Sequence, residues 1–209
     1  MLNRWNRRMY ALICKKEQTV IGAIANSDVQ RYEWLVANLA QANTQSYQDE
    51  YNRFWQMNSF KGLSSQFYQT YFNFLDPAKP MPSLRRVCEA LYQIPRAQGD
   101  QALQFSFATK LRHMLNRELP IYDGRVASFY LFGEPSIKIP LPQRINGFIV
   151  FNNALKREYR RVLITGVLAQ PIEGFKKRFS NPPLHTDVKI IDWLIYAFVQ
   201  LWGSGKISW

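Results

Sequence analysis

The segment PIYDGRV, residues 120–126, carries the side chains best suited to do chemistry. Asp123 follows an apolar turn and precedes a glycine, a basic residue and an aliphatic one, so its carboxylate is placed to open a helix. An N-cap aspartate accepts hydrogen bonds from first-turn amides, and its other oxygen can stabilise positive charge or deprotonate water. Tyr122 and His113 are the nearby side chains that can donate a proton. Asp123 is therefore predicted to be a helix cap, a catalytic carboxylate, or both.

Helices separated by proline-marked turns must position this segment. Apolar residues recur at helical spacing, and Ser, Thr or Asp precedes several of these runs as a candidate N-cap. The expected helices cover, in chain order, 28–39 behind Ser27 or Asp28, 47–55, 67–75 behind Ser64 or Ser65, 84–94 behind Ser83, 103–115, 124–129 behind Asp123, 143–161, and 188–202 behind Thr186 or Asp187. Strands are expected, if anywhere, near YALIC (10–14) and TVIGAIA (19–25). These patterns predict a mostly α fold.

The last of these runs, VKIIDWLIYAFVQLW, is apolar on nearly all faces and is predicted to be a central, buried helix. It contains Asp192, three residues after Lys189. A buried aspartate needs partners, so an ion pair between these two side chains at a helix edge is the simpler interpretation. A functional carboxylate is the alternative.

The charge of the chain favours a polyanionic partner. Its 27 Lys and Arg exceed its 15 Asp and Glu, which gives a formal net charge of +12, and a surface this basic attracts nucleic acid or anionic membranes. The longest apolar run, WLIYAFV at 193–199, is shorter than a membrane span requires, and MYALIC near the start is too short for a signal peptide. We expect a cytoplasmic protein that binds nucleic acid and does not enter a membrane.

Metal chemistry and cofactor binding are not indicated. Cys14, Cys88, His113 and His185 show no zinc-ligand spacing, and the sequence contains no P-loop, nucleophile elbow or dinucleotide fingerprint. The expectation is a protein without metal or cofactor. The length of 209 residues suits one compact unit over 1–209, and two lobes that share a cleft are compatible with it.

Residues 84–130 resemble the catalytic segment of the helix-hairpin-helix DNA glycosylases. In that family an amphipathic helix and an apolar turn precede an essential aspartate, followed by a small, a basic and an aliphatic residue, and here Asp123 to Val126 hold those places. The family's phosphate-binding hairpin corresponds to IPRAQGDQALQFS at 94–106, where Gly99 is the only glycine and Arg96 with the following helix amides would bind phosphate. Bifunctional members carry a lysine nucleophile about a helix length before the aspartate. Lys110 lies only 13 positions before it, so the resemblance implies a monofunctional member.

The resemblance implies a fold with a cleft between two helical lobes, and hydrolysis of the N-glycosidic bond of a damaged or modified base in double-stranded DNA. Asp123 would stabilise an oxocarbenium-like transition state and position water, with Tyr122 or His113 as donors. Trp55 and Tyr92 are the candidate stacking residues of a base pocket. Some relatives are similar to bacterial proteins that defend against phage. The candidate DNA-binding residues are Arg96, Lys110, Arg112, Arg125, Lys156, Arg157, Arg160 and Arg161.

Other interpretations stay open. Core packing is the alternative interpretation of the aromatic residues, because they recur at helical spacing. A solvated helix face is the alternative for the run KREYRR at 156–161. His113 could be a packing residue, and Arg125 could pair with a glutamate instead of a phosphate. The whole chain could be a non-catalytic nucleic-acid-binding protein, or a helical interaction protein whose charge serves solubility.

Overall fold

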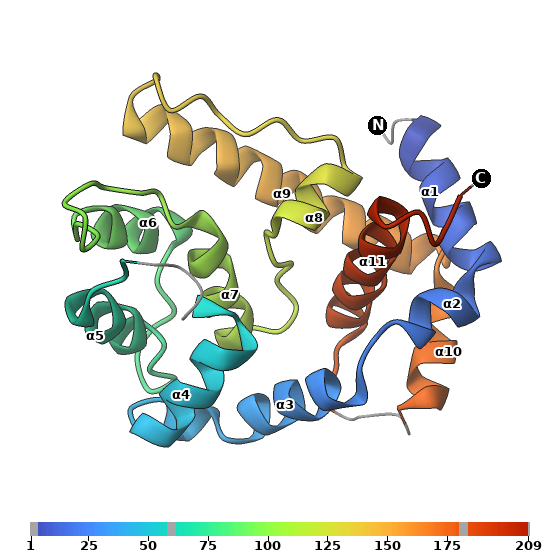
Figure 1. Cartoon of the computed structure of the whole chain (residues 1–209), viewed down its shortest axis with the longest axis horizontal. Coiled ribbons are helices and arrows are strands. Elements are labelled where there is room, and N and C mark those ends of the chain that lie inside the picture. The colour runs from blue at the N-terminus through green and yellow to red at the C-terminus, as the bar shows by residue number, and fades with distance from the viewer. Residues whose placement is uncertain (1–3, 58–61, 180–183, 209) are drawn as a thin grey trace.

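A computed structural model describes residues 4–57, 62–179 and 184–208. Within these ranges every regular element is a helix, which confirms the mostly α class. The elements are α1 (Arg4–Lys15), α2 (Glu17–Gly22), α3 (Asn26–Ala37), the 3-10 turn η1 (Leu39–Gln41), α4 (Gln45–Phe54), α5 (Ser65–Phe74), α6 (Leu84–Tyr92), α7 (Phe105–Leu115), α8 (Gly124–Phe129), α9 (Leu141–Thr165), α10 (Ala169–Arg178) and α11 (Asp187–Gly203). Figure 1 shows their arrangement.

Several helices begin where their capping residues predicted. The side chains of Ser64, Ser83 and Thr186 accept hydrogen bonds from amides in the first turns of α5, α6 and α11, which satisfies donors that have no partner within the helix. Asp123 does the same for α8. Helix α3 differs, because it begins one residue before Ser27 and has no side-chain cap. The prediction of a cap at Ser27 or Asp28 was therefore wrong.

The N-terminal segments expected to contain any strands are helical. YALIC lies inside α1, and most of TVIGAIA lies in α2. Met9, Tyr10 and Ile13 are buried together, as residues three and four apart on one helix face are. A short apolar run does not distinguish a buried helix from a strand by periodicity. Burial of one face of α1 therefore favours the helix over a strand.

Helix α11 forms the centre of the structure, as its sequence predicted. It contacts α8, α2, α10, α1 and α9, and almost every side chain from Val188 to Phe198 is buried. Figure 1 shows α4 to α7 gathered on one side of α8 and α11, with α1, α2 and α10 on the other. The fold therefore brings chain segments from both halves of the sequence to one face of α11.

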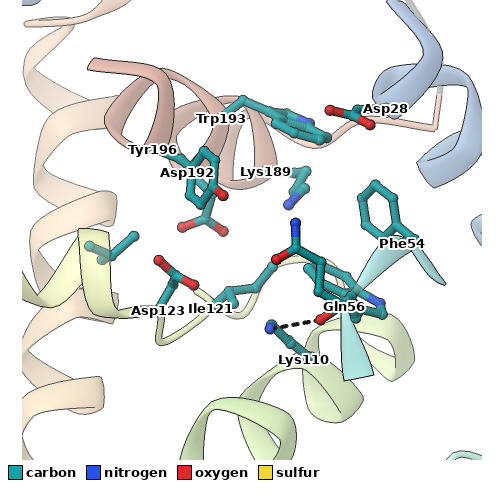
Figure 2. A pocket seen from close by; sticks show the side chains of 12 residues that line it. Asp28, Phe54, Gln56, Lys110, Ile121, Asp123, Lys189, Asp192, Trp193 and Tyr196 are labelled. Atoms are coloured by element: carbon teal, nitrogen blue, oxygen red, sulfur yellow. Dashed lines mark hydrogen bonds between the residues drawn. The ribbon is translucent and has the colours of Figure 1, made fainter. Parts of the chain in front are cut away.

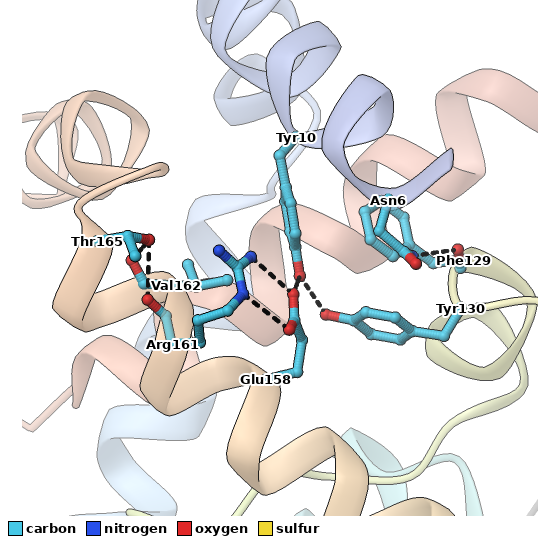
Figure 3. A network of polar contacts seen from close by, with 8 residues as sticks. All are labelled: Asn6, Tyr10, Phe129, Tyr130, Glu158, Arg161, Val162 and Thr165. Carbon is cyan, nitrogen blue, oxygen red and sulfur yellow. Dashed lines mark hydrogen bonds and ion pairs between the residues drawn. The ribbon is translucent and has the colours of Figure 1, made fainter. Parts of the chain in front are cut away.

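The long helix α9 crosses the molecule and connects its parts. It begins near Pro142, which suits a first helical turn, and ends at Gly166, whose φ of 64° is a left-handed C-cap. Glu158 of α9 accepts hydrogen bonds from Tyr10 of α1 and from Arg161 (Figure 3). The Tyr10 hydroxyl also lies 2.6 Å from that of Tyr130 at the end of α8. This network joins α1, α8 and α9.

The expectations of no membrane span and of two lobes concern the whole chain, as does the state of the two cysteines. Among the described helices, none combines the length and apolar character that a membrane span requires. Cys14 and Cys88 are both free thiols. The division into two lobes with a cleft between them stays a prediction.

Candidate functional site

Residues from α3, α4, α7, α8 and α11 line a pocket of about 150 Å³ (Figure 2). Acidic, basic and aromatic side chains share this space. The lining residues are Asp28, Phe54, Trp55, Gln56, Lys110, Ile121, Asp123, Val126, Lys189, Asp192, Trp193 and Tyr196. The pocket therefore contains three residues of the predicted site: Trp55, Lys110 and Asp123.

Asp123 caps α8 and also lines the pocket. Its Oδ1 accepts a hydrogen bond from the Arg125 amide at 2.8 Å, which caps α8. The residue is half-buried and lines the pocket, and its carboxylate points toward Asp192 in Figure 2. The cap is confirmed. Catalysis by the same carboxylate stays a prediction.

The turn before Asp123 is held by α7. The Tyr122 amide donates to Thr109 Oγ1 at 3.0 Å, and the Ser106 hydroxyl donates to the Tyr122 carbonyl at 3.1 Å. His113 Nδ1 donates to the Leu119 carbonyl at 2.7 Å. These bonds fix the backbone on which the Asp123 side chain is mounted.

Tyr122 and His113, the predicted proton donors, lie outside the pocket lining. The Tyr122 hydroxyl donates to Glu134 at 2.6 Å. His113 is fully buried, and because Nδ1 donates to a carbonyl, Nε2 accepts from the Tyr32 hydroxyl at 2.8 Å. Burial lowers the pKa of His113 to about 3, so the ring is neutral. Both side chains have structural partners that hold them away from the pocket.

Lys110 is a buried cation next to the candidate carboxylate. Its Nζ lies 5.4 Å from the centre of the Trp55 ring and 5.3 Å from that of Phe107. Burial lowers the pKa of Lys110 to about 8, and the nearby Asp123 carboxylate opposes that shift. An amine with this pKa is about one-tenth neutral at pH 7. Lys110 therefore differs from the exposed phosphate contact that its sequence position suggested.

Lys189 is a second buried cation on the same pocket. Its Nζ lies 4.5 Å from the centre of the Trp193 ring, 5.0 Å from Trp55 and 5.1 Å from Tyr32. Burial lowers the pKa of Lys189 to about 8; Asp192 opposes the shift, and Lys110 adds to it. In the described part of the chain its Nζ forms no hydrogen bond or ion pair. The predicted ion pair with Asp192 is therefore absent, although both side chains lie on the pocket.

Asp192 is a second pocket carboxylate that a hydrogen bond holds in place. Its Oδ1 accepts from the Tyr159 hydroxyl at 2.6 Å, while its Oδ2 is buried and has no partner among the described residues. Burial raises the pKa of Asp192 to about 7, against the opposing effects of Lys189, Tyr159 and the Ile121 amide. The hydrogen bond from Tyr159 to Asp192 therefore links α9 and α11 at the pocket.

Aromatic rings form much of the pocket wall. Phe54 contacts Trp55 edge-to-face with ring centres 4.6 Å apart, and Phe54 and Trp193 pack similarly at 6.1 Å. A flat base could stack on such rings. Trp55 lines the pocket, which is compatible with its predicted role as a stacking residue. Tyr92, at the end of α6, does not line the pocket.

The predicted DNA-binding arginines near the catalytic segment have different surroundings. Arg125 places its guanidinium 4.1 Å from the centre of the ring of Tyr196, a pocket residue. Arg96 pairs with Asp100 through Nε and Oδ1 at 2.9 Å. Arg112 is half-buried, and burial lowers its pKa. Of these three, only Arg125 adjoins the pocket.

The basic run on α9 is divided between surface and interior contacts. Lys156, Arg157 and Arg160 are exposed and form no ion pair within the described residues. Arg161 is bound by Glu158 at 2.9 Å (Figure 3). The first three remain available for an anionic partner, whereas Arg161 is neutralised within the fold.

On α11 the sequence indicated Lys189 and Asp192, with a functional carboxylate as the alternative to an ion pair, and it did not indicate Trp193 or Tyr196. Lys189, Asp192, Trp193 and Tyr196 follow the i, i+3, i+4, i+7 spacing of one helix face, and all four line the pocket. A polar stripe of this period inside an otherwise apolar helix was the available signal. It did not reveal which distant segments the stripe would face.

Replacement of Lys189 by Met is expected to stabilise the fold in a pH-dependent way. The folded pKa of about 8 lies below the ordinary value of 10.5, so the buried ammonium lowers stability below pH 8 and this cost disappears as the pH rises toward 10.5. The gain in the free energy of unfolding should be about 3 kcal/mol at pH 7 and small at pH 10. Urea unfolding at both pH values measures it.

The exposed Lys206 supplies the matched control, because Lys206→Met removes the same charge at the surface. It should change stability by less than about 0.5 kcal/mol at either pH. An identical gain for Lys189→Met at pH 7 and pH 10 would contradict the assignment of a buried ammonium.

The described residues contain no group of three or more His, Cys, Asp or Glu side chains placed to hold a metal ion. The expectation of a site without metal or cofactor stays a prediction. No family model matches the chain, and neither the curated proteins nor the solved structures give a significant match.

Proposed function

We propose that this protein is a DNA N-glycosylase that binds a flipped-out base in the pocket and breaks its bond to the sugar. The observation that carries the proposal is the common pocket of Asp123, Trp55 and Trp193. It combines a carboxylate on a fixed turn with rings that can stack on a base. The net charge of +12 supports a DNA partner.

The chemistry of base removal needs these groups. Breaking the N-glycosidic bond leaves positive charge on the sugar, which a fixed carboxylate stabilises. Water then attacks the anomeric carbon, and the same carboxylate can accept its proton. Capping holds one oxygen of Asp123 in place. A single aspartate can therefore serve both the helix and the reaction.

The direct test incubates the protein with duplexes that carry normal, damaged or phage-type modified bases. Alkaline cleavage reveals abasic sites, and mass analysis identifies the released base. Release from any duplex supports the proposal and names a substrate. Salt-sensitive binding with no abasic site in any duplex would instead favour a non-catalytic nucleic-acid-binding protein.

A second reaction at this site is favoured by Lys110. Its amine lies on the pocket, and its pKa of about 8 leaves a neutral fraction able to attack a sugar carbon. As the amine bonds to C1′, the base leaves with the electron pair. The nitrogen then loses a proton and the C1′–O4′ bond breaks, so that O4′ becomes a hydroxyl and C1′ forms an imine with the amine, and loss of a 2′ proton next to this imine breaks the 3′ carbon–oxygen bond. Lys110 and Asp123 thus line the same pocket. Their short spacing in the sequence had implied a monofunctional enzyme.

Borohydride trapping distinguishes the two reactions. Lyase activity is expected to give a covalent protein–DNA adduct, because hydride reduces the imine between an amine and C1′. Lys110→Met should lower the adduct yield at least about 100-fold while Lys206→Met retains it. Base release without any adduct would show that the enzyme is monofunctional.

A further inference from the structure

Lys189 offers the pocket hydrogen-bond donors that the fold does not use. The side chain is 4% exposed, and its Nζ has aromatic rings but no hydrogen-bond acceptor around it within the described residues. An ammonium group carries three donors and no acceptor. Because Lys189 lines the pocket, a ligand that supplies an acceptor here can bind these donors.

One turn further along α11, Asp192 offers the complementary group. It is also 4% exposed, and its Oδ2 is buried without a partner in the described part of the chain. Its Oδ1 is fixed by Tyr159 at 2.6 Å. The pair therefore presents a donor and an acceptor on neighbouring positions of one pocket wall.

The aromatic walls of the pocket are already in contact with cations. Lys110 and Lys189 both lie within 5.4 Å of the centre of the Trp55 ring, and Lys189 lies 4.5 Å from that of Trp193. A positively charged base stacked on these rings would meet two ammonium groups, as well as the carboxylates of Asp28, Asp123 and Asp192 that line the same pocket. Like charges at short range in a buried site repel strongly. A neutral base with hydrogen-bond acceptors avoids that repulsion.

The reaction also requires a group that assists the departing base. Heterolysis of the bond to a neutral base moves an electron pair onto the base, which becomes anionic unless it is protonated. Donors aimed at such developing charge accelerate the step. Tyr122 and His113 are bound elsewhere. Lys189 lies on the pocket and can hydrogen-bond or protonate the base as the bond breaks.

We propose that Lys189 is a catalytic residue that binds the departing base, and that the pocket selects neutral bases with a carbonyl oxygen over cationic alkylated purines. The carbonyl oxygen accepts from Lys189, and an adjacent ring N–H donates to Asp192 Oδ2. This inference rests on the proposed glycosylase function.

Matched duplexes test the selection. Each carries hypoxanthine, 8-oxoguanine or 7-methylguanine at one position, and release is corrected for spontaneous loss. Wild-type protein is expected to release a neutral base at least about 10-fold faster than 7-methylguanine. Lys189→Met should slow neutral-base release about 100-fold, and Lys206→Met should not. Equal release by Lys189→Met, or a preference for 7-methylguanine, would overturn the inference while leaving the glycosylase proposal intact.

Nucleoside binding gives a readout that does not depend on catalysis. Trp55 and Trp193 line the pocket, so a bound nucleoside should quench tryptophan fluorescence. Inosine should quench saturably and the cationic 7-methylguanosine should not, and Lys189→Met should lose the inosine response. If no duplex yields a free base but this discrimination holds, the glycosylase function fails and the pocket assignment stands. Equal or tighter binding of 7-methylguanosine would overturn the assignment.

Discussion

Asp123→Asn is expected to lower base release by about 1,000-fold while leaving the fold and DNA binding intact. Asparagine caps a helix about as well as aspartate, so the hydrogen bond to the Arg125 amide survives. The lost property is the negative charge beside the sugar. Single-turnover release from the best substrate duplex measures the effect, and thermal unfolding checks the fold.

A matched control removes a carboxylate elsewhere. Asp49 is exposed on α4, away from the pocket lining, and Asp49→Asn should retain full activity. Release by Asp123→Asn at the wild-type rate would reject the glycosylase mechanism. Loss of both release and binding with a lowered melting temperature would assign Asp123 a structural role alone.

Asp192→Ala is expected to destabilise the protein by about 2 kcal/mol at pH 7, because it leaves a buried hydrogen-bond donor without an acceptor and removes the carboxylate that opposes the burial cost of Lys189. The donor is the Tyr159 hydroxyl, which lies 2.6 Å from Asp192 Oδ1. Lys189 would then face the pocket with its burial cost undiminished. Urea unfolding measures the change.

The double variant Asp192→Ala, Lys189→Met separates the charge effect from lost packing. It should recover at least about 2 kcal/mol relative to Asp192→Ala, since the uncompensated cation is gone. Asp192→Asn keeps an acceptor for Tyr159 and should cost less than Asp192→Ala. A cost below about 1 kcal/mol for Asp192→Ala would show that the two buried groups do not depend on each other.

Local signals in the sequence predicted the helices that surround Asp123. Ser83 and Thr186 cap helices because their side chains accept first-turn amides, and this depends on a few neighbouring residues. The segments YALIC and TVIGAIA were different, because only tertiary burial decides between helix and strand in a short apolar run. Helix starts set by capping residues were therefore predictable, whereas the conformation of these short apolar runs was not.

The same division holds at the candidate site. The sequence neighbours of Asp123 predicted that it caps a helix. The position of Lys189 on the pocket depends instead on contact with Trp55, a residue far away in the chain. Tyr122 and His113 lie close to Asp123 in the sequence, which predicts them as proton donors. Glu134 and Tyr32 hold them instead, and no local pattern specifies those partners.

The hydrogen bond between the Tyr122 amide and Thr109 Oγ1 helps to hold Lys110 and Asp123 on the same pocket. Thr109 directly precedes Lys110, and Tyr122 directly precedes Asp123. Because Thr109 and Tyr122 are hydrogen-bonded to each other, the two pocket residues that follow them are kept close together. The intervening chain consists of the rest of α7 and the turn after it, and the length of that turn can change at modest entropic cost. Counting residues between lysine and aspartate therefore measures the loop and says little about the distance across the pocket.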